Sequence, residues 1–313
     1  MDGGSIGAGD GVLSPSAVSR LRRPPGPPLR PPPLADPTAI AAWRAAVNAA
    51  WLDGDPSAEA CGHREAVVGG VRVLRTWPDR DGPLVVYLHG GGYALGSPEV
   101  ALPITERLAR SVSVVSVGYR LAPEHPFPAG VEDATAVYRA LSLDAPDRPV
   151  VLAGDSAGAN LALSVALAVR DGAESAVPPP AGLLLLSPHV DHAPRPEPGG
   201  SPADRPSDVD AEAGRWLTDA YRGSLAADDP RLSPVRAELA GLSPMLIQVG
   251  TADTSLDQAV RLARRARLAG VDVDLDVWAG LWHTWHYHRD LPEADRALSE
   301  AAEFALRLSA PGP

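Results

Sequence analysis

The stretch PVVLAGDSAGANLALSVALAVR, residues 149–170, decides the fold class. It opens with an apolar run typical of a buried strand, passes through the pentapeptide GDSAG and continues as an Ala/Leu-rich helix. A serine can be held in a strained turn between such a strand and helix when glycines let the two backbones approach closely. Ser156 is therefore the candidate nucleophile. The pentapeptide alone is a weak signal, because a glycine-rich turn after a core strand would match it equally well.

Strands and helices alternate on both sides of this stretch. The alternation is typical of an α/β fold with a mostly parallel, twisted sheet and helices on both faces. The expected strands are 71–77, 84–88, 112–119, 149–154, 181–188, 245–250 and 271–278, and helices are expected at 131–141, 158–170, 211–223 and 255–270.

Two segments interrupt the alternation, one helix-rich (37–60) and one rich in Pro and Asp (191–235). We expect both to form a helical cap over the carboxyl ends of the strands, where open α/β sheets bind ligands. Residues 1–36, rich in Gly, Ser, Pro and Arg, are expected to be a disordered arm before a single domain at 37–309.

Composition narrows the function classes. The formal net charge of −11 argues against nucleic acid or an anionic membrane as a partner. All 28 basic residues are arginine, which excludes Schiff-base chemistry on a lysine. The single cysteine, Cys61, cannot form an intramolecular disulfide, and no long apolar run or signal-like start favours membrane insertion or export. A cytoplasmic location is the default expectation.

The run HGGGY, residues 89–93, follows the strand 84–88 directly. Glycines at a strand end leave main-chain N–H groups exposed, and such groups can stabilise a developing oxyanion. We expect the donors to be Gly91, Gly92 and Ala157, with Gly90 shaping the loop and His89 bracing it by a hydrogen bond. A flexible turn is the competing interpretation.

A serine hydroxyl needs a base, and the base needs a carboxylate that fixes its tautomer. Asp253 follows the strand 245–250, and His283 follows the last strand, so the order Ser156, Asp253, His283 matches an open-sheet hydrolase. Asp257 is the rival acid, although a helix-capping or loop-bracing role suits it better. The segment GLWHTWHYH, residues 280–288, also suggests a metal site, but no further Cys/His/Asp group with ligand spacing accompanies it.

These motifs together resemble the hormone-sensitive-lipase-like, or GDXG, family of α/β-hydrolases, in its bacterial carboxylesterase group. The resemblance covers about residues 37–309 and rests on HGGGYALGS, YRLAPEHPFPAGVEDA, GDSAGANLA, SPHVD, LIQVGTADTSLDQAVRLARRARLAG and WAGLWHTW, in that order. It implies a triad of Ser156, Asp253 and His283, a cap, and hydrolysis of esters with short to medium acyl chains. It implies no metal and no organic cofactor.

Charged and polar residues near these motifs are expected to support the site. Arg120, Glu124 and Asp133 are predicted to form an ion-pair network in a proline-stiffened segment, and Asp155 is predicted to anchor the neighbouring loop. Asn160 is a second candidate anchor.

The substrate pocket is less well defined by the sequence. Candidate lining residues are Tyr93, His189, Trp216, Tyr221 and Trp282. His189 occupies a position where the resembling family often has tryptophan, so a more polar or more open pocket competes with plain core packing. The partner is expected to be a small ester or acylated compound, and a homodimer is possible. An N- or O-acetyl hydrolase, a lactone hydrolase and a non-catalytic small-molecule receptor are the alternatives.

Overall fold

In the computed structural model, residues 13–22, 29–53, 62–77, 80–172, 177–193 and 211–308 are described. An eight-stranded sheet has the order β1-β2-β4-β3-β5-β6-β7-β8. The first two pairs, β1 with β2 and β2 with β4, are antiparallel, and every later pair is parallel. The strands are β1 (Gly62–Val68), β2 (Val71–Trp77), β3 (Leu84–Leu88), β4 (Ser113–Val117), β5 (Val150–Asp155), β6 (Gly182–Leu186), β7 (Met245–Gly250) and β8 (Val273–Trp278).

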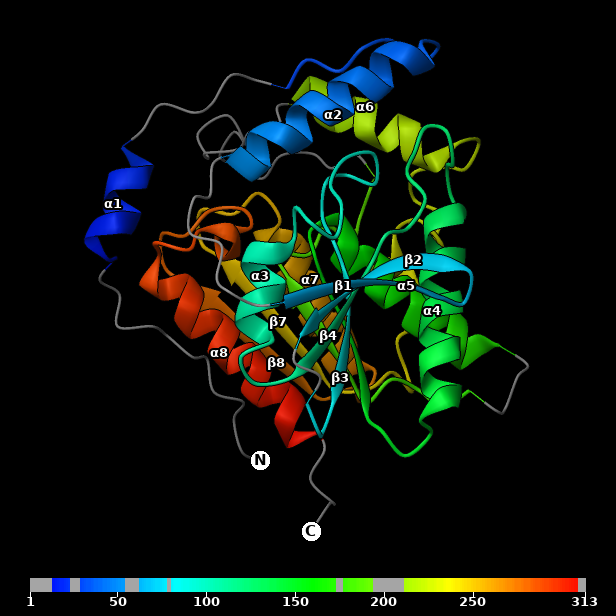
Figure 1. The fold of residues 1–313 in the computed structure, drawn as a ribbon, viewed down its shortest axis with the longest axis vertical. Helices are drawn as coiled ribbons and strands as arrows, with labels where there is room; N and C mark the ends of the chain where they lie inside the picture. Colours follow the sequence, from blue (N-terminus) through cyan, green and yellow to red (C-terminus); the bar gives the residue numbers. More distant parts are fainter. Residues whose placement is uncertain are drawn as a thin grey trace.

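Helices cover both faces of the sheet (Figure 1). One face packs against α4 (Ala129–Asp144), α5 (Ala157–Asp171) and α7 (Leu256–Leu268), and the other against α3 (Leu102–Leu108) and α8 (Pro292–Arg307). The α/β-hydrolase fold predicted from the sequence is confirmed. Short 3-10 turns, η2 (Pro234–Arg236) and η3 (Trp285–Tyr287), lie in loops.

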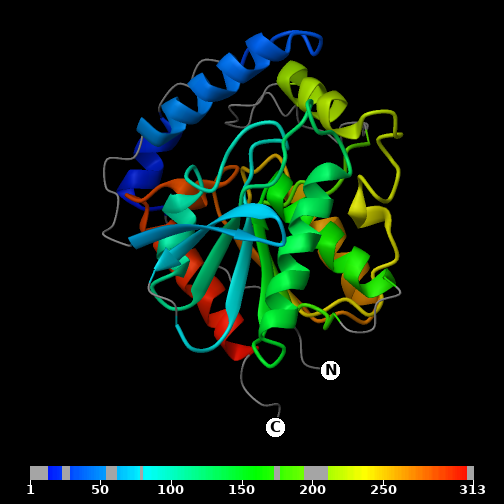
Figure 2. The ribbon, with the colours of Figure 1, turned by 45° about the vertical axis from the view of Figure 1, so that its right-hand side comes forward.

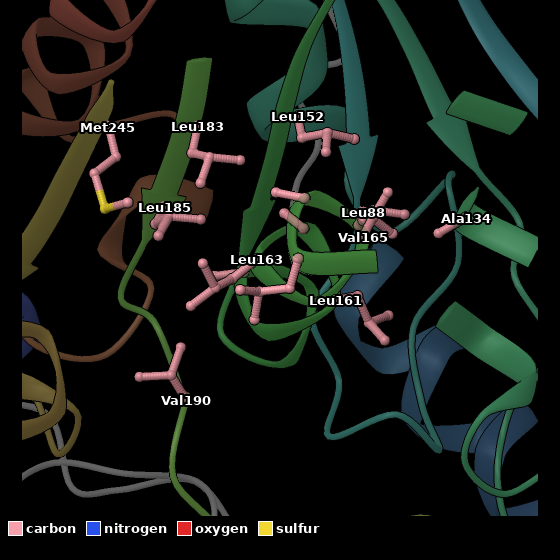
Figure 3. Close-up of a cluster of buried hydrophobic side chains, with 14 of the residues drawn as sticks. Leu88, Ala134, Leu152, Leu161, Leu163, Val165, Leu183, Leu185, Val190 and Met245 are labelled. Carbon is pink, nitrogen blue, oxygen red and sulfur yellow. The ribbon is translucent and has the colours of Figure 1, made fainter. Parts of the chain in front are cut away.

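The core follows from strand alternation. Val86 and Leu88 of β3 point to the α5 face, whereas Val85 and Tyr87 point to the α8 face. Figure 3 shows Leu88, Leu152, Leu183 and Leu185 meeting Leu161, Leu163 and Val165 of α5. Because the central strands are buried on both faces, their sequences are continuously apolar.

The α-helices described in the expected cap are α2 (Pro37–Asp53) and α6 (Ala211–Arg222). Figures 1 and 2 show them side by side across one end of the molecule. Trp43 and Trp216 meet edge to face with ring centroids 5.2 Å apart, and Trp216 donates from Nε1 to the carbonyl of Pro32 at 2.7 Å. Cys61, residues 54–60 and 194–210 of the expected cap, and residue 309 lie outside the described residues.

The expected disordered arm differs from the structure in two segments, residues 13–22 and residues 29–36, the second of which contacts the cap through Pro32 and Trp216. Helix α1 (Pro15–Leu21) starts with Ser14 as its cap, whose Oγ accepts from the Ala17 N–H at 3.1 Å. Ala17 is fully buried in a cluster with Trp278, Leu281 and Trp285. The helix is stabilised by docking on the body of the protein, which local composition could not reveal. The arm's residues 1–12 and 23–28 lie outside the described part of the chain.

Strand β1 was also missed by the sequence analysis. It forms a hairpin with β2 through Gly69 and Gly70, which both have positive φ. Its residues are mostly exposed and include His63, Arg64 and Glu65, so it lacks the apolar run on which strand prediction depends.

Candidate active site

Ser156 lies in the turn between β5 and α5 with φ 51° and ψ −115°. This backbone conformation is strained for a residue with a side chain. The turn needs glycines beside it: a Cβ on Gly158 would lie 1.9 Å from the Leu88 carbonyl oxygen, and a Cβ on Gly154 would lie 2.4 Å from Gly158. The GxSxG spacing therefore has a direct steric cause, and the serine lies in the turn just before α5 rather than in the helix.

Three side chains from different loops meet at this turn. His283 Nε2 lies 2.9 Å from Ser156 Oγ, and its Nδ1 lies 2.8 Å from Asp253 Oδ1. His283 comes from the loop between β8 and η3, and Asp253 from the turn between β7 and α7. With Nδ1–H donating to the carboxylate, Nε2 presents a lone pair to the serine hydroxyl. Such an arrangement can activate a hydroxyl nucleophile.

Asp253 is fully buried. Burial alone would raise the pKa of Asp253, but the facing His283, together with hydrogen bonds from Ser187 and the Ser255 N–H, outweighs it and holds the pKa at about 2. Ser255 donates to Oδ1 from its backbone at 2.7 Å and from Oγ at 2.8 Å. A buried carboxylate held in this way stays ionised beside the imidazole. Asp257, in contrast, lies in the first turn of α7, is exposed, and pairs with Arg261 at 3.5 Å.

The loop 89–93 turns tightly after β3. Gly91 and Gly92 have φ of 111° and 59°, values that favour glycine. Within the described chain, no residue accepts a hydrogen bond from the N–H groups of Gly91, Gly92 or Ala157. Ala157 begins α5, where helix N–H groups have no intrahelical acceptor. The three groups are thus available to an anionic oxygen.

The Asp155 side chain anchors this loop through the N–H of Gly90. Its Oδ1 accepts from the Gly90 N–H at 2.9 Å and from the Tyr87 hydroxyl at 2.7 Å, and its Oδ2 accepts from the Tyr287 hydroxyl at 3.1 Å. A Cβ on Gly90 would lie 2.2 Å from Oδ2, so only glycine fits there. Burial raises the pKa of Asp155, while these donors act in the opposite direction. The anchoring role expected for Asp155 has these contacts as its basis.

His89 braces the same loop. Its Nδ1 lies 2.7 Å from the Gly90 carbonyl oxygen, and its ring stacks on Tyr119 with centroids 4.3 Å apart. Burial lowers the pKa of His89 to about 4, so the ring is neutral.

A group of rings lies next to the loop. Tyr93, with φ 65°, stacks on Tyr221 of α6 at 3.6 Å, and its hydroxyl lies 3.0 Å from His192 Nε2. A Cβ on Gly92 would lie 2.6 Å from Leu217, also on α6. The cap helix α6 therefore packs directly on the loop that carries the candidate oxyanion donors. His192 was missed by the sequence analysis, since no motif or spacing links it to Tyr93.

The other candidate pocket residues differ in position. His189 follows β6, and its N–H donates to the Ser156 carbonyl at 3.2 Å. Trp216 contacts Trp43 of the cap and Pro32 of the arm, and Trp282 donates from Nε1 to His288 at 3.3 Å. His189 and Tyr93 thus lie beside Ser156 or next to the loop 89–93, whereas the two tryptophans contact other parts of the chain.

The predicted ion-pair network is wrong in one partner. Arg120 pairs with Asp133 at 2.8 Å, as expected, and also with Glu132 at 3.2 Å. Glu124, however, pairs with Arg44 of α2 at 2.7 Å. The proline-rich turn directs the Glu124 carboxylate toward the cap, and a partner from that distant helix could not be inferred locally. Asn160 donates to the His189 and Leu232 carbonyls at 3.2 and 3.0 Å.

The three histidines near the C-terminus point to different surroundings. His283 faces Ser156, the fully buried His286 stacks on Trp285 at 3.9 Å, and His288 is half-buried beside Trp282. Across the described residues, no group of three or more His, Cys, Asp or Glu side chains is arranged to hold a metal ion. Among the helices that the structure describes, none is long and apolar enough to cross a membrane.

Known proteins share both the fold and the sequence of this chain. A family profile described as alpha/beta hydrolase fold matches residues 85–287. An acetyl-hydrolase of Streptomyces hygroscopicus is 40% identical over 243 residues, covering 74% of this chain and 78% of its own, and an esterase of Acinetobacter venetianus is 35% identical over 234 residues, covering 72% and 75%. A hormone-sensitive lipase from a metagenome library superposes with a TM-score of 0.78 at 35% identity, covering 86% of this chain and 93% of its own.

The fold and these matches define the class: the chain is an α/β-hydrolase, and it belongs to the hormone-sensitive-lipase-like family. The resemblance found in the sequence is thereby confirmed.

Proposed function

We propose that this protein hydrolyses carboxylic esters through an acyl-enzyme formed on Ser156. The observation that carries the proposal is the chain of two hydrogen bonds, 2.9 Å from Ser156 to His283 and 2.8 Å from His283 to Asp253. The names of its relatives, esterase, acetyl-hydrolase and hormone-sensitive lipase, support the same reaction.

In the first half-reaction, Ser156 Oγ attacks the ester carbonyl carbon while His283 Nε2 takes the hydroxyl proton. Asp253 stabilises the resulting imidazolium, and the N–H groups of Gly91, Gly92 and Ala157 stabilise the negative carbonyl oxygen. The tetrahedral intermediate collapses, the C–O bond to the alcohol breaks, and His283 returns the proton to the departing alcohol.

In the second half-reaction, water attacks the acyl-enzyme carbonyl and His283 takes its proton. The acid is released and Ser156 recovers its proton. In a mechanism of this kind, each oxyanion donor contributes about 3 kcal/mol to lowering the barrier.

The test is hydrolysis of p-nitrophenyl esters, from acetate to decanoate, by wild type and Ser156→Ala. We expect turnover of the short and medium esters by wild type and loss of nearly all of it in the variant, and a fluorophosphonate should label wild type alone. Ser299→Ala, an exposed serine on α8, is the control and should keep full activity. Turnover that survives Ser156→Ala would contradict the proposal.

Acetyl esters are the first substrate class to examine, because the relative at 40% identity is named an acetyl-hydrolase. Acetylated sugars and N-acetyl peptides in the same assay would separate an O-acetyl hydrolase from an N-acetyl hydrolase.

A further inference from the structure

A histidine with no part in the proposed proton transfers lies next to Ser156. His189 is held there by its own N–H, which donates to the Ser156 carbonyl at 3.2 Å. Its ring meets His192 edge to face with centroids 5.0 Å apart, and His192 lies 3.0 Å from the Tyr93 hydroxyl. His189 therefore continues the wall of rings that starts at the loop 89–93.

Gln258 of α7 fixes the tautomer of His189. The Gln258 side-chain oxygen accepts from the N–H groups of Val190 at 2.7 Å and Asp191 at 2.8 Å. Only the oxygen of an amide can accept two N–H groups, so the NH₂ group must be the one that lies 3.3 Å from His189 Nδ1. Because that NH₂ group donates, Nδ1 must carry the lone pair, and the proton of a neutral ring must be on Nε2.

The ring is neutral throughout the ordinary working range. Burial, reinforced by the nearby His283, lowers the pKa of His189 to about 4, although the carboxylates of Asp191 and Asp253 act in the opposite direction. Within the described chain, no residue accepts a hydrogen bond from Nε2–H, and the residue is only half-buried. The side chain thus holds a fixed, uncharged donor for which the described residues supply no hydrogen-bond acceptor.

We propose that the Nε2–H of His189 determines specificity by donating to an oxygen of the substrate, so that preferred esters carry an ether, keto or hydroxyl oxygen near the scissile carbonyl. The proposal rests on the proposed function of the same site. The physical basis is the cost of burying an N–H without an acceptor. An alkyl group packed against His189 would remove water from the Nε2–H and give it no acceptor, whereas an ester with an oxygen at that place would accept its hydrogen bond. The second ester is therefore favoured.

Two pairs of nearly isosteric esters test it. p-Nitrophenyl methoxyacetate and butyrate differ in one acyl position, and 2-methoxyethyl acetate and butyl acetate differ in one alcohol position. For each pair, the ratio of kcat/KM values is measured for wild type, His189→Met and His189→Gln. Met and Gln have similar size and length, but only Gln retains a donor near the position of Nε2.

We expect His189→Met to lower the oxygen-to-alkyl ratio about tenfold in one of the two pairs, and His189→Gln to recover part of it. The pair that responds identifies whether the oxygen belongs in the acyl or the alcohol part. The intrinsic reactivity of the two esters is the same for every enzyme, so it cancels when their kcat/KM ratios are compared between wild type and variant. Each ratio is also independent of the fraction of folded enzyme, because both esters are measured with the same preparation. His125→Met, an exposed histidine, is the control and should leave both ratios at the wild-type value.

An unchanged ratio in both pairs for an active His189→Met enzyme would overturn the specificity proposal and leave the esterase proposal intact. A lowered ratio that Gln does not raise at all would also overturn it, because loss of shape rather than of the donor would then be the cause. Absence of turnover of all four esters by wild type would instead count against the proposed function.

Discussion

Asp253 and Asp257 are four residues apart, yet their surroundings assign them to different tasks. Asp253 is fully buried and lies 2.8 Å from His283, whereas Asp257 is exposed on α7. We expect Asp253→Asn to lower kcat by about 10⁴-fold, because an amide no longer holds the imidazole in its working tautomer. Asp257→Asn should leave kcat close to wild type. Steady-state hydrolysis of a p-nitrophenyl ester measures both, and equal losses in the two variants would show that the acid has been misassigned.

The three histidines of the segment 280–288 give a second prediction at this scale. Only His283 reaches Ser156, whereas His288 contacts Trp282 and His286 is packed on Trp285. His283→Ala should therefore abolish turnover, while His288→Ala and His286→Phe should retain it. Phe keeps the flat ring that stacks on Trp285. Circular dichroism melting of each variant separates lost chemistry from lost folding, and a folded but inactive His288→Ala would contradict the assignment.

The site residues found from the sequence belong to local sequence patterns, whereas those missed depend on contacts between residues far apart in the chain. Ser156 and the glycines beside it are adjacent in the chain, and His283 and Asp253 each follow a strand, so local pattern and chain order suffice to find them. His192, Tyr287 and Arg44 act through contacts with Tyr93, Asp155 and Glu124 across long stretches of chain. No periodicity or motif reports such contacts.

The same distinction holds for whole elements. The strand β7 was predicted at its exact bounds, since a continuous apolar run marks a strand buried on both faces. Helix α1 and strand β1 were missed because their stability comes from neighbours. Helix α1 docks on α8 and the loop that carries His283, and β1 pairs with one described strand, β2.

The docking of α1 is testable with one matched pair of variants. Ser14 donates to both carboxylate oxygens of Glu293, and Ala17 is fully buried against the 278–297 region. Ala17→Glu would place a charge in this apolar contact, and we expect it to lower Tm by about 5 °C and to speed proteolysis near residues 13–22. Ser19→Glu, exposed on the same helix, should do neither. Equal melting of the two variants would mean that α1 contributes nothing to the fold.

The carboxylate of Asp276 lies between β8 and α8, and its ionisation destabilises the folded state. Burial, with the nearby Glu300 as a further cause, raises the pKa of Asp276 to about 6, although Trp278 donates to it at 2.6 Å. A raised carboxyl pKa means that the folded state binds the proton more tightly, so stability falls as pH rises from about 4 to 6 and stays lower above that. Asp276→Asn keeps an acceptor for Trp278 and removes the charge.

We therefore expect Asp276→Asn to be more stable than wild type by about 1–2 kcal/mol at pH 7.5, with the difference vanishing near pH 4. The value allows for screening by water, since the side chain is only partly buried. Urea unfolding at several pH values measures it, with Asp274→Asn, exposed on the same strand, as the control. A stability gain that does not change with pH would rule out this titration as its cause.

At the scale of the whole molecule, the layered sheet could be predicted because alternation alone specifies it, but the attachment of the cap could not. Arg44 of α2 makes the charged part of that attachment, beside Asn48, whose side chain exchanges two hydrogen bonds with Gly96. The guanidinium of Arg44 donates to Glu124 at 2.7 and 3.0 Å, to the Ala94 carbonyl at 2.6 Å and to the Ala122 carbonyl at 2.9 Å. The Arg44 guanidinium lowers the pKa of Glu124. One side chain thus ties the cap to the chain that follows the loop 89–93 and to the proline-rich turn.

Arg44→Met should free α2 while leaving the sheet intact. Loss of charged hydrogen bonds worth about 2 kcal/mol would accelerate amide exchange in residues 37–53 by about 30-fold, with no change in β5. Hydrogen exchange followed by mass spectrometry resolves the two regions. Arg30→Met is the matched control, because Arg30 pairs with Glu212 of α6 at 3.5 Å with both side chains 71% exposed, and exposed pairs contribute little. If Arg30→Met accelerates exchange as much as Arg44→Met, or if β5 opens together with α2, the cap is not held by Arg44 as a separate unit.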